Sequence, residues 1–139
     1  MKEDYDSYLD EESEVELVGR LEENLRLNRS VFFDLHEFEG IIEFYLAGDD
    51  RAKVRKAIEI AENIYPNSSE IQLKKAEFCF LEERYEDALH LLEFVENVDY
   101  HNPELQYLKG EIFYELGDLN KSIQSFDKAI AVATDDRSE

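Results

Sequence analysis

The fold is decided by the stretch from Asn102 to Ala133, which reads NPELQYLKGEIFYELGDLNKSIQSFDKAIAVA. Asn102 is a helix-capping residue, and Pro103 follows it at the first helical position, where the missing N–H of proline is harmless. Apolar residues recur every three or four positions on both sides of Gly117-Asp118, a pair typical of turns. The stretch therefore predicts two helices of about 13 residues, joined by a tight turn.

The same helical pair occurs twice more towards the N-terminus. Capping sequences stand at Asp34-Leu35-His36-Glu37 and at Asn67-Ser68-Ser69-Glu70, so successive caps are 33 and 35 residues apart. Breaks fall between the caps at Gly48-Asp49-Asp50 and Glu83-Arg84. No segment alternates apolar and polar residues as a half-buried strand would. We therefore expect an all-α chain built from units of about 34 residues.

A shift of the sequence by about 34 residues brings residues of similar size into register. The aligned sets are Phe44, Phe78 and Ile112; Tyr45, Cys79 and Phe113; Leu46, Phe80 and Tyr114; Val54, Ala88 and Ser122; Ile58, Leu92 and Phe126; and Ala61, Val95 and Ala129. Small residues on one helix let its neighbour approach closely. Because one helical pair cannot bury its apolar faces alone, we expect the units to stack.

This repeat resembles the tetratricopeptide repeat family, whose pattern places Trp, Leu-Gly and Tyr on the first helix and Ala, Phe, Ala and then Pro on the second. The matching residues are Phe38, Ile41, Tyr45, Ala61 and Pro66 in the first unit, Ala76, Tyr85, Ala88, Leu92 and Val95 in the second, and Gly110, Phe113, Gly117-Asp118, Ser122, Phe126 and Ala129 in the third. Gln72 and Gln106 replace the tryptophan of the pattern. Lys75 and Lys109 replace its leucine. Ile42 is too large for the family's small site, so we expect looser packing in the first unit.

The resemblance implies a right-handed α-solenoid of about three helix-turn-helix repeats, at 35–68, 69–102 and 103–134. Before them, an N-terminal capping helix over 15–28 is predicted by one apolar stripe, formed by Val15, Val18, Leu21 and Leu25. Residues 1–14 are strongly acidic, and we expect them to form a mobile tail. The last helix, Leu119–Ala133, has no cap in the sequence. We expect either further repeats in a longer parent protein, which we favour, or a contact with another copy.

Composition excludes several classes of partner. The 139 residues include 15 Lys and Arg against 35 Asp and Glu, a formal net charge of −20. This charge disfavours binding to nucleic acid and to an anionic membrane surface. No apolar run approaches the ~20 residues of a membrane span, and no apolar stretch follows Met1 as in a secretory signal. With a single cysteine, Cys79, these features predict a cytoplasmic protein.

Catalytic and metal chemistry find little support in the sequence. Cys79 falls at an aromatic core position of its repeat, which favours a buried filler over a nucleophile. His36 with Glu39, and His90 with Glu93, have a spacing that could begin a metal site, but no further ligand completes either pair. Asp4, Asp6 and Asp10 lack the glycine and glutamate of a calcium loop. We therefore expect a chain without catalytic residues, metal or cofactor.

The resemblance also implies a ligand groove along the first helices of the repeats. Its sites map onto Glu39, Glu43, Leu46, Leu73, Lys74, Glu77, Phe80, Tyr107, Leu108, Glu111 and Tyr114, with His36, Leu81 and Glu115 beside them. Two rows stand out, an acidic row of Glu43, Glu77 and Glu111, and an apolar row of Leu46, Phe80 and Tyr114. The glutamates could instead only solvate a helix face or pair with Lys74 and Lys75.

The leading hypothesis is a non-catalytic protein-interaction module that binds a basic or apolar peptide or helix in this groove. Some tetratricopeptide domains clamp a chaperone's acidic C-terminus with basic groove residues, and here glutamates at those sites would repel it. The alternative is a self-assembly element that forms a homodimer through the uncapped C-terminal repeat. A metal-dependent helical enzyme is less well supported. The sequence leaves the partner, its pathway, the parent's length and the oligomeric state open.

Overall fold

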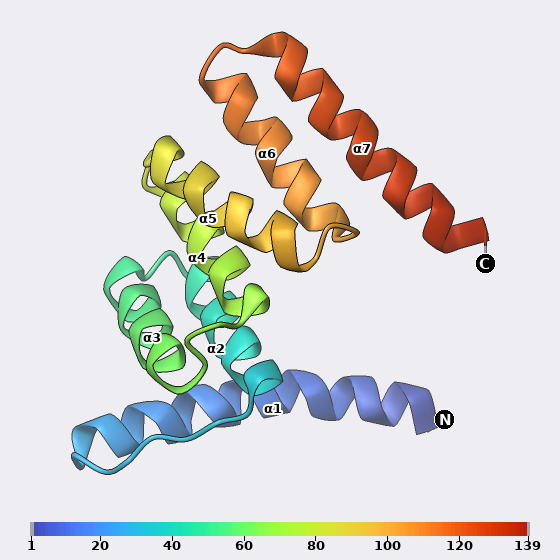
Figure 1. Ribbon diagram of the computed structural model, residues 1–139. Coiled ribbons are helices and arrows are strands. Elements are labelled where there is room, and N and C mark those ends of the chain that lie inside the picture. The colour runs from blue at the N-terminus through green and yellow to red at the C-terminus, as the bar shows by residue number, and fades with distance from the viewer. Residues whose placement is uncertain (1, 139) are drawn as a thin grey trace. The chain divides into compact units, whose positions relative to one another are not determined.

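The computed structural model describes the backbone of residues 2–138 and the side chains of residues 14–134. Over this range the chain forms seven α-helices and no strand (Figure 1), so the predicted all-α class is confirmed. The helices are α1 (Lys2–Arg26), α2 (Leu35–Ala47), α3 (Arg51–Ile64), α4 (Ser69–Leu81), α5 (Tyr85–Val98), α6 (Pro103–Glu115) and α7 (Leu119–Ser138). We call α2–α3 hairpin 1, α4–α5 hairpin 2 and α6–α7 hairpin 3.

The capping residues show why the hairpins begin where they do. Asp34 forms the predicted capping box with Glu37, and the Asn102 side chain accepts a hydrogen bond from the Glu104 N–H. The cap of α4 is Ser68 and not the predicted Asn67, because the Ser68 hydroxyl accepts the bond from the Ile71 N–H at 3.2 Å. With this correction the caps stand at 34, 68 and 102, and the period is 34 residues in both intervals.

The turns inside the hairpins repeat with the same period. Asp49, Glu83 and Gly117 all have a left-handed backbone, with φ of 53°, 61° and 82°. The next N–H in each turn binds a carbonyl of the preceding helix, as Arg84 does with Cys79 at 2.8 Å. Glycine therefore occupies the left-handed position only in hairpin 3. In hairpin 1 the predicted break is correct, but Gly48 keeps helical dihedrals and the strained position falls on Asp49.

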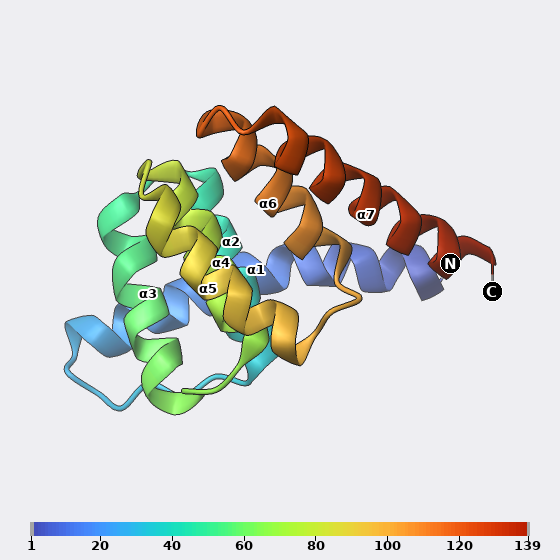
Figure 2. The same cartoon turned by 45° about the horizontal axis from the view of Figure 1, so that its top comes forward.

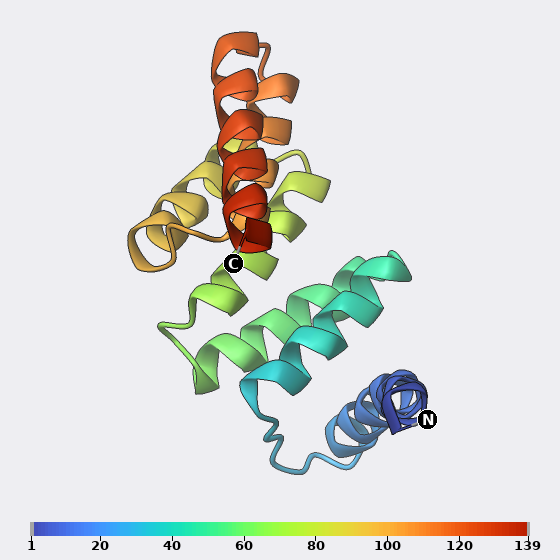
Figure 3. The same ribbon diagram turned by 90° about the vertical axis from the view of Figure 1, so that its right-hand side faces the viewer.

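The chain divides into two compact units, and the first, Met1–Pro66, contains α1, α2 and α3. In this unit α1 packs on α2, and α2 packs on α3 (Figure 3). The Glu22 carboxylate of α1 accepts hydrogen bonds from the Tyr45 hydroxyl at 2.9 Å and the Lys53 ammonium at 3.0 Å. These bonds join all three helices, and the one from Lys53 does most to hold the pKa of Glu22 below its usual value.

Helix α1 differs from the prediction in its apolar face and its length. Leu17, Val18 and Leu21 are buried, whereas Val15 and Leu25, both predicted for the buried stripe, are exposed. The helix begins at Lys2, so its backbone takes in the acidic stretch that was expected to be a tail. The side chains of residues 1–13 lie outside the described residues, and the mobility of this stretch stays a prediction.

The second unit, Asn67–Glu139, contains hairpins 2 and 3. Each hairpin packs its two helices together, and α6 also packs on α5 and contacts α4 (Figure 2). One core runs through both hairpins, built by Leu73, Ala76, Cys79, Ala88, Leu92, Val95, Leu105, Leu108 and Ile112. This is the stacking that a helical repeat requires. The superhelix expected over all three hairpins stays a prediction.

Candidate peptide-binding surface

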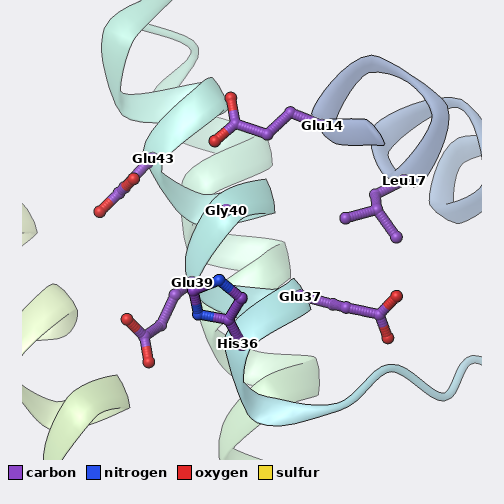
Figure 4. Close-up of a pocket in the computed structure, with 7 residues that line it drawn as sticks. All are labelled: Glu14, Leu17, His36, Glu37, Glu39, Gly40 and Glu43. Atoms are coloured by element: carbon purple, nitrogen blue, oxygen red, sulfur yellow. The ribbon is translucent and has the colours of Figure 1, made fainter. Parts of the chain in front are cut away.

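Unit 1 has a pocket of about 200 Å³ between α1 and the first helix of hairpin 1 (Figure 4). Its lining residues are Glu14 and Leu17 from α1 with His36, Glu37, Glu39, Gly40 and Glu43 from α2. Gly40 faces α1, since a Cβ atom there would lie 3.6 Å from the Glu14 side chain, an ordinary contact distance. The pocket thus contains Glu39 and Glu43, two of the groove residues predicted from the sequence.

The pocket is strongly acidic, and its four glutamates do not all have the same role. The Glu37 carboxylate accepts a 3.0 Å bond from the Asp34 N–H, and Arg20 lies 3.8 Å away, so this residue serves the helix cap. Glu39 is half-buried and Glu43 is exposed on the α2 surface. Figure 4 shows Glu14 reaching towards α2 from the other wall. The sequence did not point to Glu14 or Leu17, since both were assigned to a tail or a cap.

The groove residues of unit 2 separate into a buried set and an exposed set. Leu73 and Leu108 lie in the core, so a ligand would meet their neighbours and not these two side chains. Lys74 is also buried, and its ammonium lies 3.8 Å from the Glu77 carboxylate. The pairing of a groove glutamate with Lys74, the alternative seen in the sequence, therefore occurs at Glu77.

The apolar row is only partly available to a ligand. Phe80 is half-buried against the core, with its ring centroid 5.8 Å from that of Tyr85. Leu46 is half-buried in unit 1. Tyr114 is 62% exposed. Tyr107 is exposed as well, but its ring packs on Phe126 of α7 at 5.5 Å. Tyr114 is therefore the most accessible aromatic anchor among the predicted groove residues.

Glu111 and Glu115 place uncompensated negative charge next to Tyr114 on α6. They are one helical turn apart, where like charges repel. Partial burial and the charge of Glu115 raise the pKa of Glu111 above its usual value. Glu115 also raises the pKa of Tyr85 at the start of α5, after the larger effect of burial. Among the described residues, no lysine or arginine lies within ion-pair distance of Glu111 or Glu115.

The residues considered for chemistry occupy ordinary structural positions. Cys79 is 2% exposed in the core of unit 2, and burial raises the pKa of its thiol, which disfavours the reactive thiolate. His36 and His90 are exposed on different helices. Within residues 14–134, no three or more His, Cys, Asp or Glu side chains are grouped so as to hold a metal ion.

Together these features describe an all-α, helical repeat-like fold, with three hairpins of one period and several acidic side chains on α2 and on α6. In comparisons with known proteins, no family model and no curated protein matches this chain. Within the described part of the chain, every helix is too short or too polar to cross a lipid bilayer.

Proposed function

We propose that this chain is a non-catalytic protein-interaction module of the tetratricopeptide type, which acts in the cytoplasm and binds a protein segment carrying basic and apolar side chains. The 34-residue period of caps and turns supports the class. The observation that carries the binding proposal is the pair Glu111 and Glu115 beside the exposed ring of Tyr114. A lysine or arginine of the partner would relieve the repulsion between the two carboxylates, and an apolar side chain would cover the ring.

The net charge of the chain also supports a basic partner. A net charge of −20 attracts cationic segments over long distances, and it raises their rate of association. The acidic pocket of unit 1 is a second place on a first helix where a basic side chain would be favoured. An aromatic side chain such as Tyr114 contributes mainly to the lifetime of the complex, since it is desolvated after encounter.

A direct test uses synthetic helix-forming peptides of about 15 residues that differ in their number of Lys and Leu residues. Binding is followed by titration calorimetry at low and high salt, on the wild type and on Glu111→Lys. The matched control is Glu93→Lys, the same charge reversal at an exposed site on the second helix of hairpin 2. We expect Glu111→Lys to weaken binding of basic peptides at least ~10-fold, and Glu93→Lys to change it less than about 3-fold.

The choice of Glu111 over Glu77 follows from the structure. Reversal of Glu77 would also disturb the buried ammonium of Lys74, so lost binding and lost stability would be mixed. Phe80→Ala has the same weakness because Phe80 packs on the core, whereas Tyr114→Ala removes an exposed ring. Equal binding by wild type, Glu111→Lys and Tyr114→Ala would refute the proposed surface. Binding that favours acidic peptides would refute the proposed partner chemistry.

A further inference from the structure

Two aromatic rings of hairpin 2 lie beside the α6 carboxylates on which the proposed function rests. Phe80, near the end of α4, and Tyr85, at the start of α5, have ring centroids 5.8 Å apart, and both side chains pack at the edge of the core of unit 2. Each residue is half-buried, so part of each stays open to solvent. The turn that joins α4 and α5 lies on the same side of unit 2 as the end of α6 (Figures 1 and 2).

The helical register of α6 places both carboxylates beside these rings. Leu108 and Ile112 belong to the core against which the rings pack. Glu111 and Glu115 follow Leu108 by three and seven residues, so they continue the same face of the helix beyond the core. Glu115 is close enough to Tyr85 to raise the pKa of its hydroxyl, after the larger effect of burial. We call these four residues the ring–carboxylate site: Phe80, Tyr85, Glu111 and Glu115.

The chain supplies no cation to this site from its described residues. Within residues 14–134, no lysine or arginine lies within ion-pair distance of Glu111 or Glu115. Arg84 directly precedes Tyr85, but its guanidinium is bound to the Asp87 carboxylate, at 3.0 Å from Nε and 2.8 Å from Nη2. A cation that fills the ring–carboxylate site therefore has to come from a partner.

The site belongs to hairpins 2 and 3 and is not a general feature of the repeat. One 34-residue period earlier, the equivalent positions hold one carboxylate, an arginine and no aromatic ring: Leu46, Arg51, Glu77 and Leu81. The two rings and two carboxylates are thus particular to the ring–carboxylate site, which makes a particular ligand chemistry the natural explanation for them.

The cation–ring contacts within the chain illustrate which cation suits a ring beside a carboxylate. In unit 1 the guanidinium carbon of Arg20 lies 4.7 Å from the centroid of the Phe33 ring, and its Nη2 lies 3.8 Å from the Glu37 carboxylate. The ammonium groups of Lys53 and Lys121 lie farther from their rings, at 5.8 and 5.5 Å. A guanidinium approaches an aromatic face closely because it is planar and more weakly hydrated than an ammonium group.

Arginine also suits a pair of carboxylates. Its five donors form a rigid fork, so one guanidinium binds two acceptors at its edge while its face stays free for a ring. Residues one turn apart on a helix have Cβ atoms about 5–6 Å apart, and the fork bridges such a pair better than the point charge of an ammonium group does.

We propose that the ring–carboxylate site selects an arginine side chain of the partner, whose guanidinium lies on the ring of Tyr85 and donates to Glu111 and Glu115. This inference rests on the proposed function, and it adds the identity of the cation and the two rings of hairpin 2. Arginine and lysine carry the same charge, so attraction by the net charge of the chain does not distinguish them. A preference for arginine therefore reports on the site itself.

Titration calorimetry on the intact chain tests the proposal with two helix-forming peptides that are identical except that every lysine of one is an arginine in the other. The variants are Tyr85→Leu, which removes the ring but keeps an apolar side chain, and Glu115→Gln. The matched controls are Tyr85→Phe and Glu93→Gln. We expect the wild type to bind the arginine peptide at least ~5-fold more tightly. Both variants should reduce this ratio below about 2-fold, and both controls should keep it.

Thermal melts establish which variants fold, and Glu115→Gln carries the test if Tyr85→Leu unfolds, because Glu115 is exposed. Equal affinities of the wild type for the two peptides would overturn the arginine site and leave the proposed function standing. A preference for arginine that persists in the folded variants would also overturn it, since another part of the chain would then select the cation. Failure of both peptides to bind would refute the proposed function and this inference with it.

Discussion

Gly110 of α6 lies directly against the ring of Phe126 of α7. A Cβ atom at this glycine would be 2.6 Å from Cε1 of the ring and 2.9 Å from Cζ. The Ser122 hydroxyl donates a 2.8 Å bond to the Gly110 carbonyl and holds the two backbones at this crossing. The equivalent residues of hairpins 1 and 2 are Ile42 and Ala76. The residue at this position thus becomes smaller from hairpin 1 to hairpin 3.

We predict that Gly110→Ala destabilises the protein by about 1–3 kcal/mol, because the added methyl group must push the Phe126 ring out of its position. The control is Gly19→Ala on α1, where a Cβ atom would meet nothing within 4 Å. That change should stabilise the helix by up to ~1 kcal/mol, since alanine is the better helix former. Chemical denaturation of the three proteins measures both effects. A Gly110→Ala variant as stable as the wild type would show that α6 and α7 do not approach as described.

Glu83→Gly is predicted to stabilise hairpin 2. Glu83 has φ 61°, a conformation that disfavours any residue with a side chain, whereas glycine adopts it freely. After the greater entropy of glycine in the unfolded state is deducted, a net gain of about 0.5–1 kcal/mol remains. Gly117→Ala, at the equivalent turn of hairpin 3, should lose a similar amount. Midpoints of thermal unfolding that move in the same direction for both variants would contradict this reasoning.

The hairpins could be predicted from the sequence because each has local signals at both ends. The predicted capping sequence at Asp34 and the predicted break at Gly48-Asp49-Asp50 match the two ends of α2. The face of α1 was harder to predict. The apolar residues of α1 allow two alternative buried stripes, one that includes Val15 and one that includes Leu17. Only the packing of α1 against α2 shows that the stripe with Leu17 is the buried one. The break at Gly48-Asp49-Asp50 did not say which residue takes the left-handed backbone, and the structure places it on Asp49.

The candidate surface could be predicted only in its outline. Periodicity placed Glu111 and Tyr114 on the first helix of hairpin 3, and both are partly or largely exposed. The family resemblance also named Leu73 and Leu108 as groove residues, but the stacking of α6 on hairpin 2 buries both in the core. A residue's position within one repeat does not reveal what the next repeat covers. For the same reason Glu14, which enters its pocket from a helix before the repeats, gave no signal.

We predict that Glu96→Gln destabilises the protein by about 0.5–1 kcal/mol at neutral pH, with solvent screening of this partly exposed pair keeping the effect small. The bond from Lys109 holds the pKa of Glu96 below its usual value. A carboxyl group whose pKa is lower in the folded than in the unfolded state stabilises the protein at pH values above its pKa in the unfolded state. This contribution is lost as the pH falls through the pKa of the group in the folded state. The stability difference between wild type and variant should therefore shrink below pH 4.5.

Denaturation midpoints measured between neutral pH and about pH 3 check this prediction, with Glu93→Gln as the control for loss of one negative charge from α5. The control should show little change in stability, because Glu93 is exposed and no bond ties it to α6. A difference between Glu96→Gln and wild type that stays constant down to the lowest pH would mean that the ion pair with Lys109 does not stabilise the fold.

The last prediction concerns the coupling of binding to protons at Glu111. Burial and Glu115 raise the pKa of this carboxyl in the free protein, and a bound lysine or arginine would lower it. Binding of a basic peptide should therefore release protons, and its affinity should fall as the pH drops from neutral towards the raised pKa of Glu111. Calorimetry in two buffers of different ionisation enthalpy measures the number of protons released. Glu111→Gln should reduce that number and flatten the pH profile, whereas Glu93→Gln should leave both as in the wild type. Proton release that persists unchanged in Glu111→Gln would place the cation at other carboxylates, such as those of the unit 1 pocket.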